Sequence, residues 1–93
     1  MELKNVAGED RGKIILYALS TCGWCKRTKQ LLNELGVAYS YVDVDQVESG
    51  EKSRIMGEVS KWNPACSFPT LVINNEKCIV GFKDDEIKAA LGR

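Results

Sequence analysis

Residues 14–25 read IILYALSTCGWC, an apolar run that leads into two cysteines separated by two residues. The first six residues are continuously apolar and include β-branched and aromatic side chains, which predicts a strand covered on both faces. Ser20 and Thr21 offer hydroxyl groups that can cap a helix, and a helix is predicted from about Gly23 to Leu35. The cysteine pair therefore stands where a buried strand passes into a helix.

Strand and helix patterns continue along the rest of the chain. Gly36 is placed to end the first helix in a left-handed conformation. Residues 74–76 join two short strands as a hairpin, and Asp84 opens a last helix. The elements predicted after the first helix are a strand at 37–44, a helix at 48–62, strands at 70–73 and 77–80, and a helix from Asp84. The buried faces predicted for the first two helices comprise Thr28, Leu31, Leu32, Leu35, Ile55, Met56, Val59 and Trp62.

The order of these elements predicts an α/β fold with a four-stranded mixed sheet and helices on both faces. A strand–helix–strand unit has a right-handed crossover and parallel strands, and the hairpin adds antiparallel pairing. Ninety-three residues suffice for one compact domain, which we expect at residues 13–93. The polar residues 1–12 lack a sustained periodicity and are expected to form an N-terminal leader.

Composition narrows the class of protein further. Thirteen basic residues balance thirteen acidic ones, which argues against a general nucleic-acid or membrane-surface binder. No apolar run approaches the roughly 20 residues that span a bilayer, and no stretch of signal-peptide type occurs, so a cytoplasmic protein is expected. The chain has no histidine, which excludes a Cys–His protease and any metal site with a histidine ligand.

The spacing of Cys22 and Cys25 at a strand–helix junction favours redox chemistry over zinc binding. Zinc needs four ligands, and Cys66 and Cys78 lack the tight spacing of a second ligand pair. At a helix start the sulfur of Cys22 lies beside unpaired backbone N–H groups, which favour its thiolate. Cys25 lies close enough to form a disulfide with it. We therefore expect Cys22 to attack a partner disulfide and Cys25 to resolve the mixed disulfide.

A second candidate feature is Ser67-Phe68-Pro69-Thr70, because proline lacks an N–H and is expected at a strand's first residue. Two interpretations stay open. Pro69 either simply begins a strand, or it is a cis proline packed against the cysteine pair that leaves the Phe68 backbone free to pair with an extended partner. Trp24 has two interpretations as well, as a partner contact or as a packed surface aromatic.

Three motifs resemble the glutaredoxin branch of the thioredoxin superfamily over residues 13–92: TCxxC after an apolar strand, FPT before the third strand and VGFxxxEI before the last helix. The resemblance implies the thioredoxin fold and a cytosolic thiol–disulfide carrier. It also implies that Cys22 is the nucleophile, Cys25 the resolving thiol and Pro69 a cis proline.

Several residues depart from the pattern of glutathione-using glutaredoxins: the centre is CGWC and not CPYC, and Lys83 follows the Gly-Phe pair. Leu19 stands where they usually carry a lysine, and Phe82 replaces the second residue of their Gly-Gly pair, while Asp84 remains. The Gly-Phe pair is similar to the glutaredoxin-like hydrogen donors of ribonucleotide reductase, the NrdH-redoxins, which take electrons from a protein reductase. The substrate-binding residues expected from these motifs are Trp24, Phe68, Pro69, Gly81, Phe82 and Asp84.

The resulting expectation is a monomeric enzyme that reduces protein disulfides by dithiol exchange. Its electron donor is expected to be glutathione or a thioredoxin-reductase-like protein, with no bound cofactor, no metal, and no nucleic-acid or membrane partner. Two alternatives are a glutathione-dependent [2Fe–2S] cluster-binding glutaredoxin and a non-catalytic thioredoxin-fold adaptor. Cys66 is interpreted as a filler or a regulatory thiol, and Cys78 as a small buried hydrophobic residue.

Overall fold

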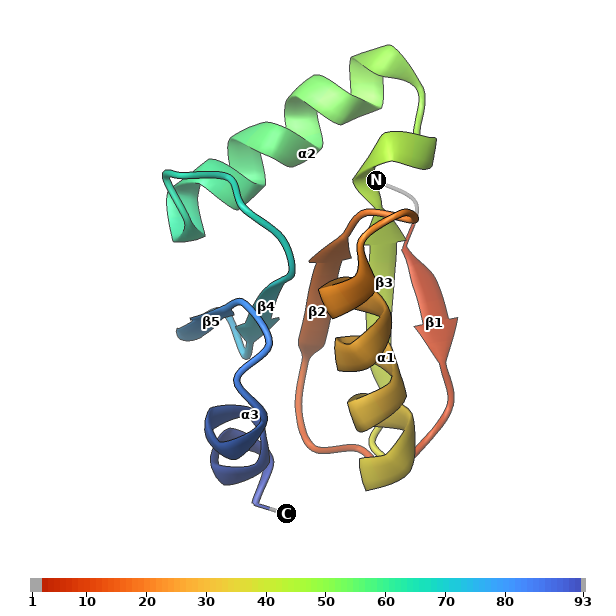
Figure 1. Ribbon diagram of the computed structural model, residues 1–93, viewed down its shortest axis with the longest axis vertical. Helices are drawn as coiled ribbons and strands as arrows, with labels where there is room; N and C mark the ends of the chain where they lie inside the picture. Colours follow the sequence, from red (N-terminus) through yellow and green to blue (C-terminus); the bar gives the residue numbers. More distant parts are fainter. Residues whose placement is uncertain (1–2, 93) are drawn as a thin grey trace.

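The computed structural model describes residues 3–92, and Figure 1 shows their arrangement. Residues 1–2 of the expected leader and residue 93 of the expected domain lie outside this range. The chain order is β1 (Lys4–Val6), β2 (Ile14–Ala18), α1 (Gly23–Leu35), β3 (Tyr39–Asp43), the short 3₁₀ helix η1 (Val44–Gln46), α2 (Ser49–Trp62), β4 (Thr70–Ile73), β5 (Lys77–Val80) and α3 (Asp84–Leu91). The predicted elements all occur, within one or two residues of their expected ends.

The strands form one mixed sheet in the order β1-β3-β2-β4-β5. The central strand β2 runs parallel to β3 and antiparallel to β4. The parallel pair follows from the strand–helix–strand unit, and the antiparallel pairing of β4 with β5 follows from the hairpin. This is the expected α/β architecture of the thioredoxin fold.

The prediction of four strands was wrong, because β1 adds a fifth at the edge of the sheet. Lys4, Asn5 and Val6 pair antiparallel with β3, and the Ser40 hydroxyl donates to Asn5 Oδ1 at 2.6 Å. Without β1, the outer edge of β3 would leave a row of unpaired backbone groups. Three residues are too short to show a period of two, so the sequence pattern did not reveal this strand.

The central strand β2 is buried along its whole length, as its apolar run predicted. Its side chains alternate between two core clusters, one on each face of the sheet. Ile14, Leu16 and Ala18 pack with residues of α1 and α3, whereas Ile15 and Tyr17 pack with residues of α2. The sheet therefore lies between one helix layer of α1 and α3 and another of α2, and all five β2 side chains are enclosed.

The expected buried faces of the helices are largely confirmed. Leu31 and Leu32 of α1 and Ile55 and Val59 of α2 are buried. The remaining four residues of the predicted faces divide as follows: Thr28 is buried, and Leu35, Met56 and Trp62 are half-buried. Among residues 3–92, no helix combines the length and the apolar character that crossing a bilayer requires.

The start of α1 differs from the expectation in one important respect. Neither Ser20 nor Thr21 caps the helix; the N-cap residue is Cys22 itself, in extended conformation. Its sulfur accepts a hydrogen bond from the backbone N–H of Cys25. The end of α1 is as predicted, because Gly36 adopts a left-handed conformation with φ 70°.

Candidate redox site

The sulfur of Cys22 lies at the positive end of α1. Cys22 precedes the first helical residue, and the Cys25 backbone N–H donates to Cys22 Sγ over 3.2 Å. The unpaired N–H groups and the dipole of a helix start stabilise negative charge on a neighbouring sulfur. Cys22 is half-buried, so its sulfur combines this stabilisation with access to a partner.

Cys25 has the opposite environment, since it is fully buried in the core cluster shared by α1 and the sheet. Burial, and after it the hydrogen bond with Cys22, raises the pKa of the Cys25 thiol to about 12. A hydrogen bond with the Leu19 backbone lowers this pKa by less, and the charges of Cys22 (raising) and Lys29 (lowering) contribute least. Cys25 is therefore a neutral thiol at rest, in contact with the more accessible sulfur of its neighbour. The two cysteines therefore differ in accessibility, with Cys22 half-buried and Cys25 buried.

An open groove of about 230 Å³ is lined on one side by Trp24, the residue directly before Cys25. Five of the six expected substrate-binding residues line it, namely Trp24, Phe68, Pro69, Gly81 and Phe82. The ring of Trp24 is stacked on that of Phe82, with 5.8 Å between centroids and 22° between planes. Trp24 is nevertheless 59 % exposed, the only large hydrophobic side chain so exposed among residues 3–92. The groove thus presents an aromatic wall to solvent.

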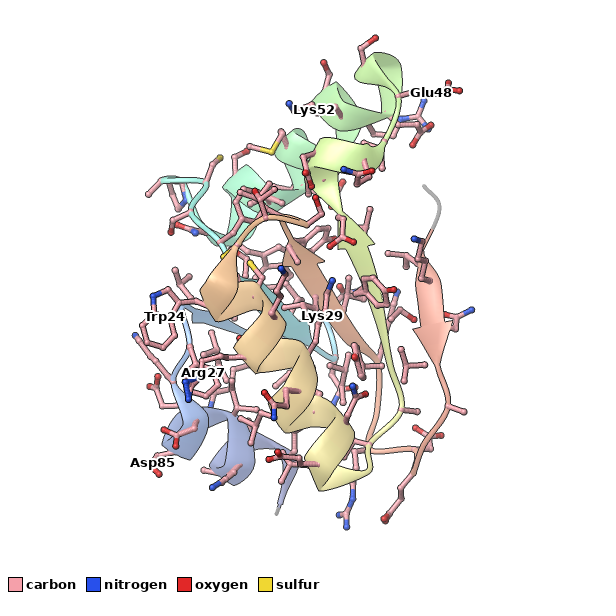
Figure 2. All side chains as sticks on the ribbon, turned by 45° about the vertical axis from the view of Figure 1, so that its right-hand side comes forward. Trp24, Arg27, Lys29, Glu48, Lys52 and Asp85 are labelled. Atoms are coloured by element: carbon pink, nitrogen blue, oxygen red, sulfur yellow. The ribbon has the colours of Figure 1, made fainter. Side chains whose placement is uncertain are left out.

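The guanidinium of Arg27 lies over this aromatic wall, 6.0 Å from the Trp24 ring and 5.9 Å from the Phe82 ring. Figure 2 shows Trp24 and Arg27 on the side of α1 that faces α3. A cation over ring faces is attracted by their negative electrostatic potential. Arg27 therefore places a positive charge next to both rings of the wall.

The opposite wall of the groove is built by the loop that enters β4. The peptide bond between Phe68 and Pro69 is cis, as the family resemblance implied. The Pro69 carbonyl accepts from the Gly81 N–H at 2.9 Å, which ties the loop to the end of β5. Gly81 has φ 84°, a conformation that side chains disfavour, and it keeps the groove open at this point.

Hydrogen bonds among Asn63, Ser67 and Thr70 hold the same loop. The side-chain amide of Asn63 donates to the Ser67 carbonyl, the Ser67 hydroxyl and the Thr70 hydroxyl, at 3.0, 3.0 and 3.2 Å. The Thr70 hydroxyl in turn donates to the Ser67 carbonyl at 2.8 Å. Asn63 is also the residue that ends α2, as its C-cap. Its contacts with Ser67 and Thr70 depend on the tertiary approach of the two ends of the loop.

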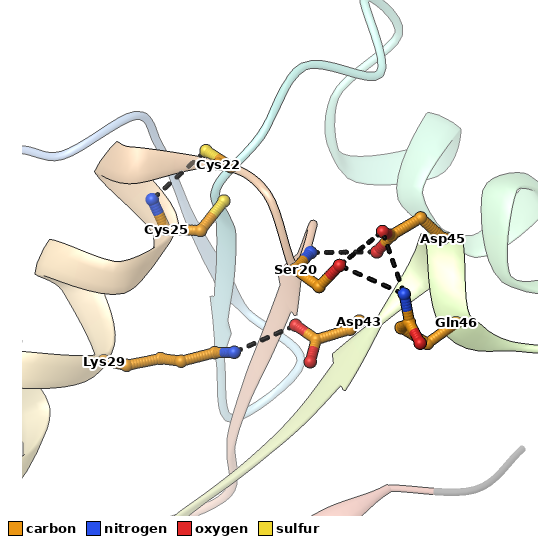
Figure 3. A network of polar contacts seen from close by, with 7 residues as sticks. All are labelled: Ser20, Cys22, Cys25, Lys29, Asp43, Asp45 and Gln46. Carbon is orange, nitrogen blue, oxygen red and sulfur yellow. Dashed lines mark hydrogen bonds and ion pairs between the residues drawn. The ribbon is translucent and has the colours of Figure 1, made fainter.

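Asp45 anchors the turn that leads from β2 to Cys22. Its carboxylate accepts from both the backbone N–H and the hydroxyl of Ser20, and Gln46 donates to the same two side chains (Figure 3). These hydrogen bonds, above all those from Ser20, lower the pKa of the Asp45 carboxyl to about 2. Ser20 thus links the turn before Cys22 to η1 rather than capping α1.

The anchor makes a pH-dependent contribution to stability. The pKa of Asp45 is 3.8 in the unfolded chain and about 2 in the folded protein. The hydrogen-bonded carboxylate therefore stabilises the fold fully above pH 3.8, and this stabilisation is lost as the pH falls from 3.8 to about 2. We expect Asp45→Asn to lower the urea midpoint near neutral pH, and the difference from the native protein to shrink below about pH 4. In a Ser20→Ala background the same substitution is expected to have a smaller effect. A difference that persists unchanged at pH 2 would contradict this account.

Three residues singled out from sequence lie elsewhere. Asp84 is the exposed first residue of α3, and its carboxylate accepts a hydrogen bond from the Asp85 N–H. It does not line the groove. Cys66 packs against the core cluster on the α2 face, whereas Cys22 and Cys25 belong to the cluster on the opposite face. Cys78 is half-buried, and burial raises the pKa of its thiol.

Neither a metal site nor a larger cavity competes with the cysteine pair. Within residues 3–92, no three acidic, cysteine or histidine side chains come together as a metal site requires. A larger hollow of about 500 Å³ lies between β3 and the start of α2, and none of the expected catalytic or substrate-binding residues lines it. Its lining residues are Lys4, Val42, Asp43, Gln46, Val47, Glu48 and Glu51.

A cysteine pair at the start of α1, together with a cis proline before β4 of a mixed sheet, defines a thioredoxin-fold protein of the thiol–disulfide class. Comparison with known proteins specifies the family. The Glutaredoxin family profile matches residues 14–79, and the chain belongs to this family, whose members are in general thiol–disulfide oxidoreductases.

Solved structures are similar over the whole chain. The crystal structure of methanoredoxin from Methanosarcina acetivorans has a TM-score of 0.93 at 54 % identity and covers 100 % of this chain and 97 % of its own. The glutaredoxin from Methanosarcina mazei Go1 has a TM-score of 0.92 at 53 % identity. The match covers 100 % of this chain and 90 % of the chain of that structure. Glutaredoxin-C1 of Arabidopsis thaliana is 28 % identical over 60 residues, 64 % of this chain. The chain spans 46 % of the length of that plant relative.

Proposed function

We propose that this protein reduces disulfide bonds of other proteins by dithiol exchange through Cys22 and Cys25. The observation that carries the proposal is their asymmetry: the sulfur of Cys22 is accessible at a helix start, and Cys25 is buried and neutral in contact with it. An accessible thiolate attacks efficiently, and a protected neighbouring thiol avoids competing reactions.

The exchange proceeds in two balanced steps. The Cys22 thiolate attacks one sulfur of the partner disulfide, forms a mixed disulfide and expels the other partner sulfur as a thiolate, which takes up a proton. Cys25 then loses its proton and attacks Cys22 Sγ, which forms the Cys22–Cys25 disulfide and releases the second partner thiol. Two electrons pass from the protein to its partner, and an external donor must return them.

The groove supports recognition of an extended polypeptide next to its disulfide. Pairing of β4 with β2 begins at Thr70, so Phe68 lies outside that ladder and its backbone can pair with an incoming strand. The stacked rings of Trp24 and Phe82 offer apolar surface for a side chain of the partner. Protein disulfides fit this combination because they present both an extended backbone and apolar neighbours.

A protein reductase is the donor that the site favours over glutathione. Leu19 supplies no cation at the position where the glutathione-using relatives usually carry a lysine. Phe82 fills the position of a second glycine, and its ring is stacked on Trp24 in the groove. An aromatic wall of this kind suits contact with another protein's surface better than a small charged peptide.

The test is reduction of insulin disulfides with dithiothreitol as donor, which measures the exchange independently of the natural reductant. We expect catalysis well above the dithiothreitol background. Replacing dithiothreitol by thioredoxin reductase with NADPH is expected to sustain more turnover than glutathione with glutathione reductase. A folded, colourless protein without dithiothreitol-driven activity would favour the adaptor alternative, and a coloured protein that needs glutathione would favour the cluster-binding alternative.

A further inference from the structure

Lys29 is a charged residue of α1 that has no role in the two exchange steps described above. It lies four residues after Cys25 on α1, one helical turn along the same side. Its ammonium is 2.9 Å from Asp43 Oδ1 at the end of β3 and lies 4.3 Å from the centre of the Tyr41 ring. Both members of the ion pair are mostly covered, with side chains 21 % and 14 % exposed.

This arrangement immobilises a positive charge between α1 and the sheet. An exposed lysine samples many conformations, and an exposed ion pair contributes little. Here the carboxylate and the ring fix the ammonium from two sides, and partial burial reduces screening by solvent. Figure 3 shows Cys25 and Lys29 projecting from α1 toward the sheet, with the ammonium directed at Asp43. Arg27, by contrast, lies on the side that faces α3 (Figure 2).

We propose that Lys29, held by Asp43 and Tyr41, is a positioning residue that stabilises negative charge on Cys25 Sγ while Cys25 attacks the mixed disulfide. The inference rests on the proposed function and assigns the residue that assists its second step. In that step the Cys25 S–H bond breaks and a bond to Cys22 Sγ forms. The partner sulfur leaves with the electron pair of the broken disulfide and receives the proton directly or through water.

The contribution of Lys29 becomes more important once the mixed disulfide exists. In the resting protein, burial raises the pKa of Cys25 most, and a hydrogen bond and charge from Cys22 raise it further. A Cys22 sulfur bound to a partner carries no charge, so its charge no longer opposes ionisation of Cys25. The groups that still favour the Cys25 thiolate are the Leu19 backbone and the Lys29 ammonium. Of these two groups, Lys29 is the one that carries a positive charge.

The experiment separates the two steps by stopped-flow reaction of the reduced protein with 5,5′-dithiobis(2-nitrobenzoate). Attack by Cys22 releases a first thionitrobenzoate, and attack by Cys25 releases a second. We expect Lys29→Gln and Lys29→Met to slow the second release by roughly threefold to tenfold and to move its pH profile to higher pH, because a neighbouring cation favours the thiolate. The first release is expected to change by less than about twofold.

Two further variants make charge the tested property. Lys29→Arg keeps the charge and is expected to restore the rate of the second release. Lys52→Met removes an exposed lysine on α2, well away from Lys29 in Figure 2, and is expected to change neither release. The inference is overturned if the glutamine variant resolves as fast as the native protein, if arginine is as slow as glutamine, or if both releases slow equally. Failure of the native protein to release a second thionitrobenzoate would instead overturn the proposed function.

Discussion

Replacing Cys22 by serine is expected to abolish disulfide reduction. A serine hydroxyl is not ionised near neutral pH and forms no disulfide, so neither the attack nor the mixed disulfide remains. The N-cap role survives the substitution, because a serine hydroxyl also accepts from a backbone N–H. We therefore expect a folded protein whose dithiothreitol-driven insulin reduction is no faster than the background, with thermal unfolding as the check on folding.

Matched cysteine variants identify the step that is lost. Cys66→Ser changes a thiol of similar exposure on the other face of the sheet, and its activity is expected to stay within about twofold of the native value. Cys25→Ser keeps the attacking sulfur but is expected to stop at a mixed disulfide, visible as a mass increase equal to the bound partner. Substantial insulin reduction by Cys22→Ser would contradict the assignment of the nucleophile.

Leu32→Ala is expected to have the largest effect on stability, because Leu32 attaches α1 to the sheet. Its side chain is fully buried in the cluster that also contains Cys25. Truncation of a buried leucine leaves a cavity and typically costs about 2–5 kcal/mol. Domains of this size are stable by only about 5–15 kcal/mol, so this is a large fraction of the total. Urea unfolding followed by circular dichroism measures the loss.

The matched control lies two residues earlier on the same helix. Gln30 is exposed and makes a 3.4 Å contact with exposed Glu34, so Gln30→Ala is expected to change stability by about 0.5 kcal/mol or less. Equal losses for the two variants would show that α1 is not held by its apolar face.

The alternation of elements and the place of the cysteine pair could be predicted because both depend on local patterns. An uninterrupted apolar run has one compatible environment, a strand enclosed on both faces, and β2 has that environment. Gly36 ends α1 and the hairpin joins β4 to β5 as expected, since turn and cap residues act through their own backbone conformations.

The fifth strand and the true helix cap could not be predicted in the same way. The three residues of β1 gain their structure only from the open edge of β3. Serine is a good capping residue by type. The hydroxyl and the backbone N–H of Ser20 instead donate hydrogen bonds to the carboxylate of Asp45, 25 positions away. Competition between a local and a distant hydrogen-bond partner is resolved by the folded arrangement, not by residue type.

The opening motif, residues 14–25, illustrates both kinds of information. Its amino-acid sequence was sufficient to place the cysteine pair at a strand–helix junction, because strand propensity and cysteine spacing are local properties. The difference between the two sulfurs depends on contacts from other elements: the core buries Cys25, and Asp43 at the end of β3 fixes the ammonium of Lys29, four residues after Cys25 on α1. The groove likewise joins Trp24 to Phe68 and Phe82, which are distant in sequence. Burial and charge act through space, so these properties exist only once the chain has folded.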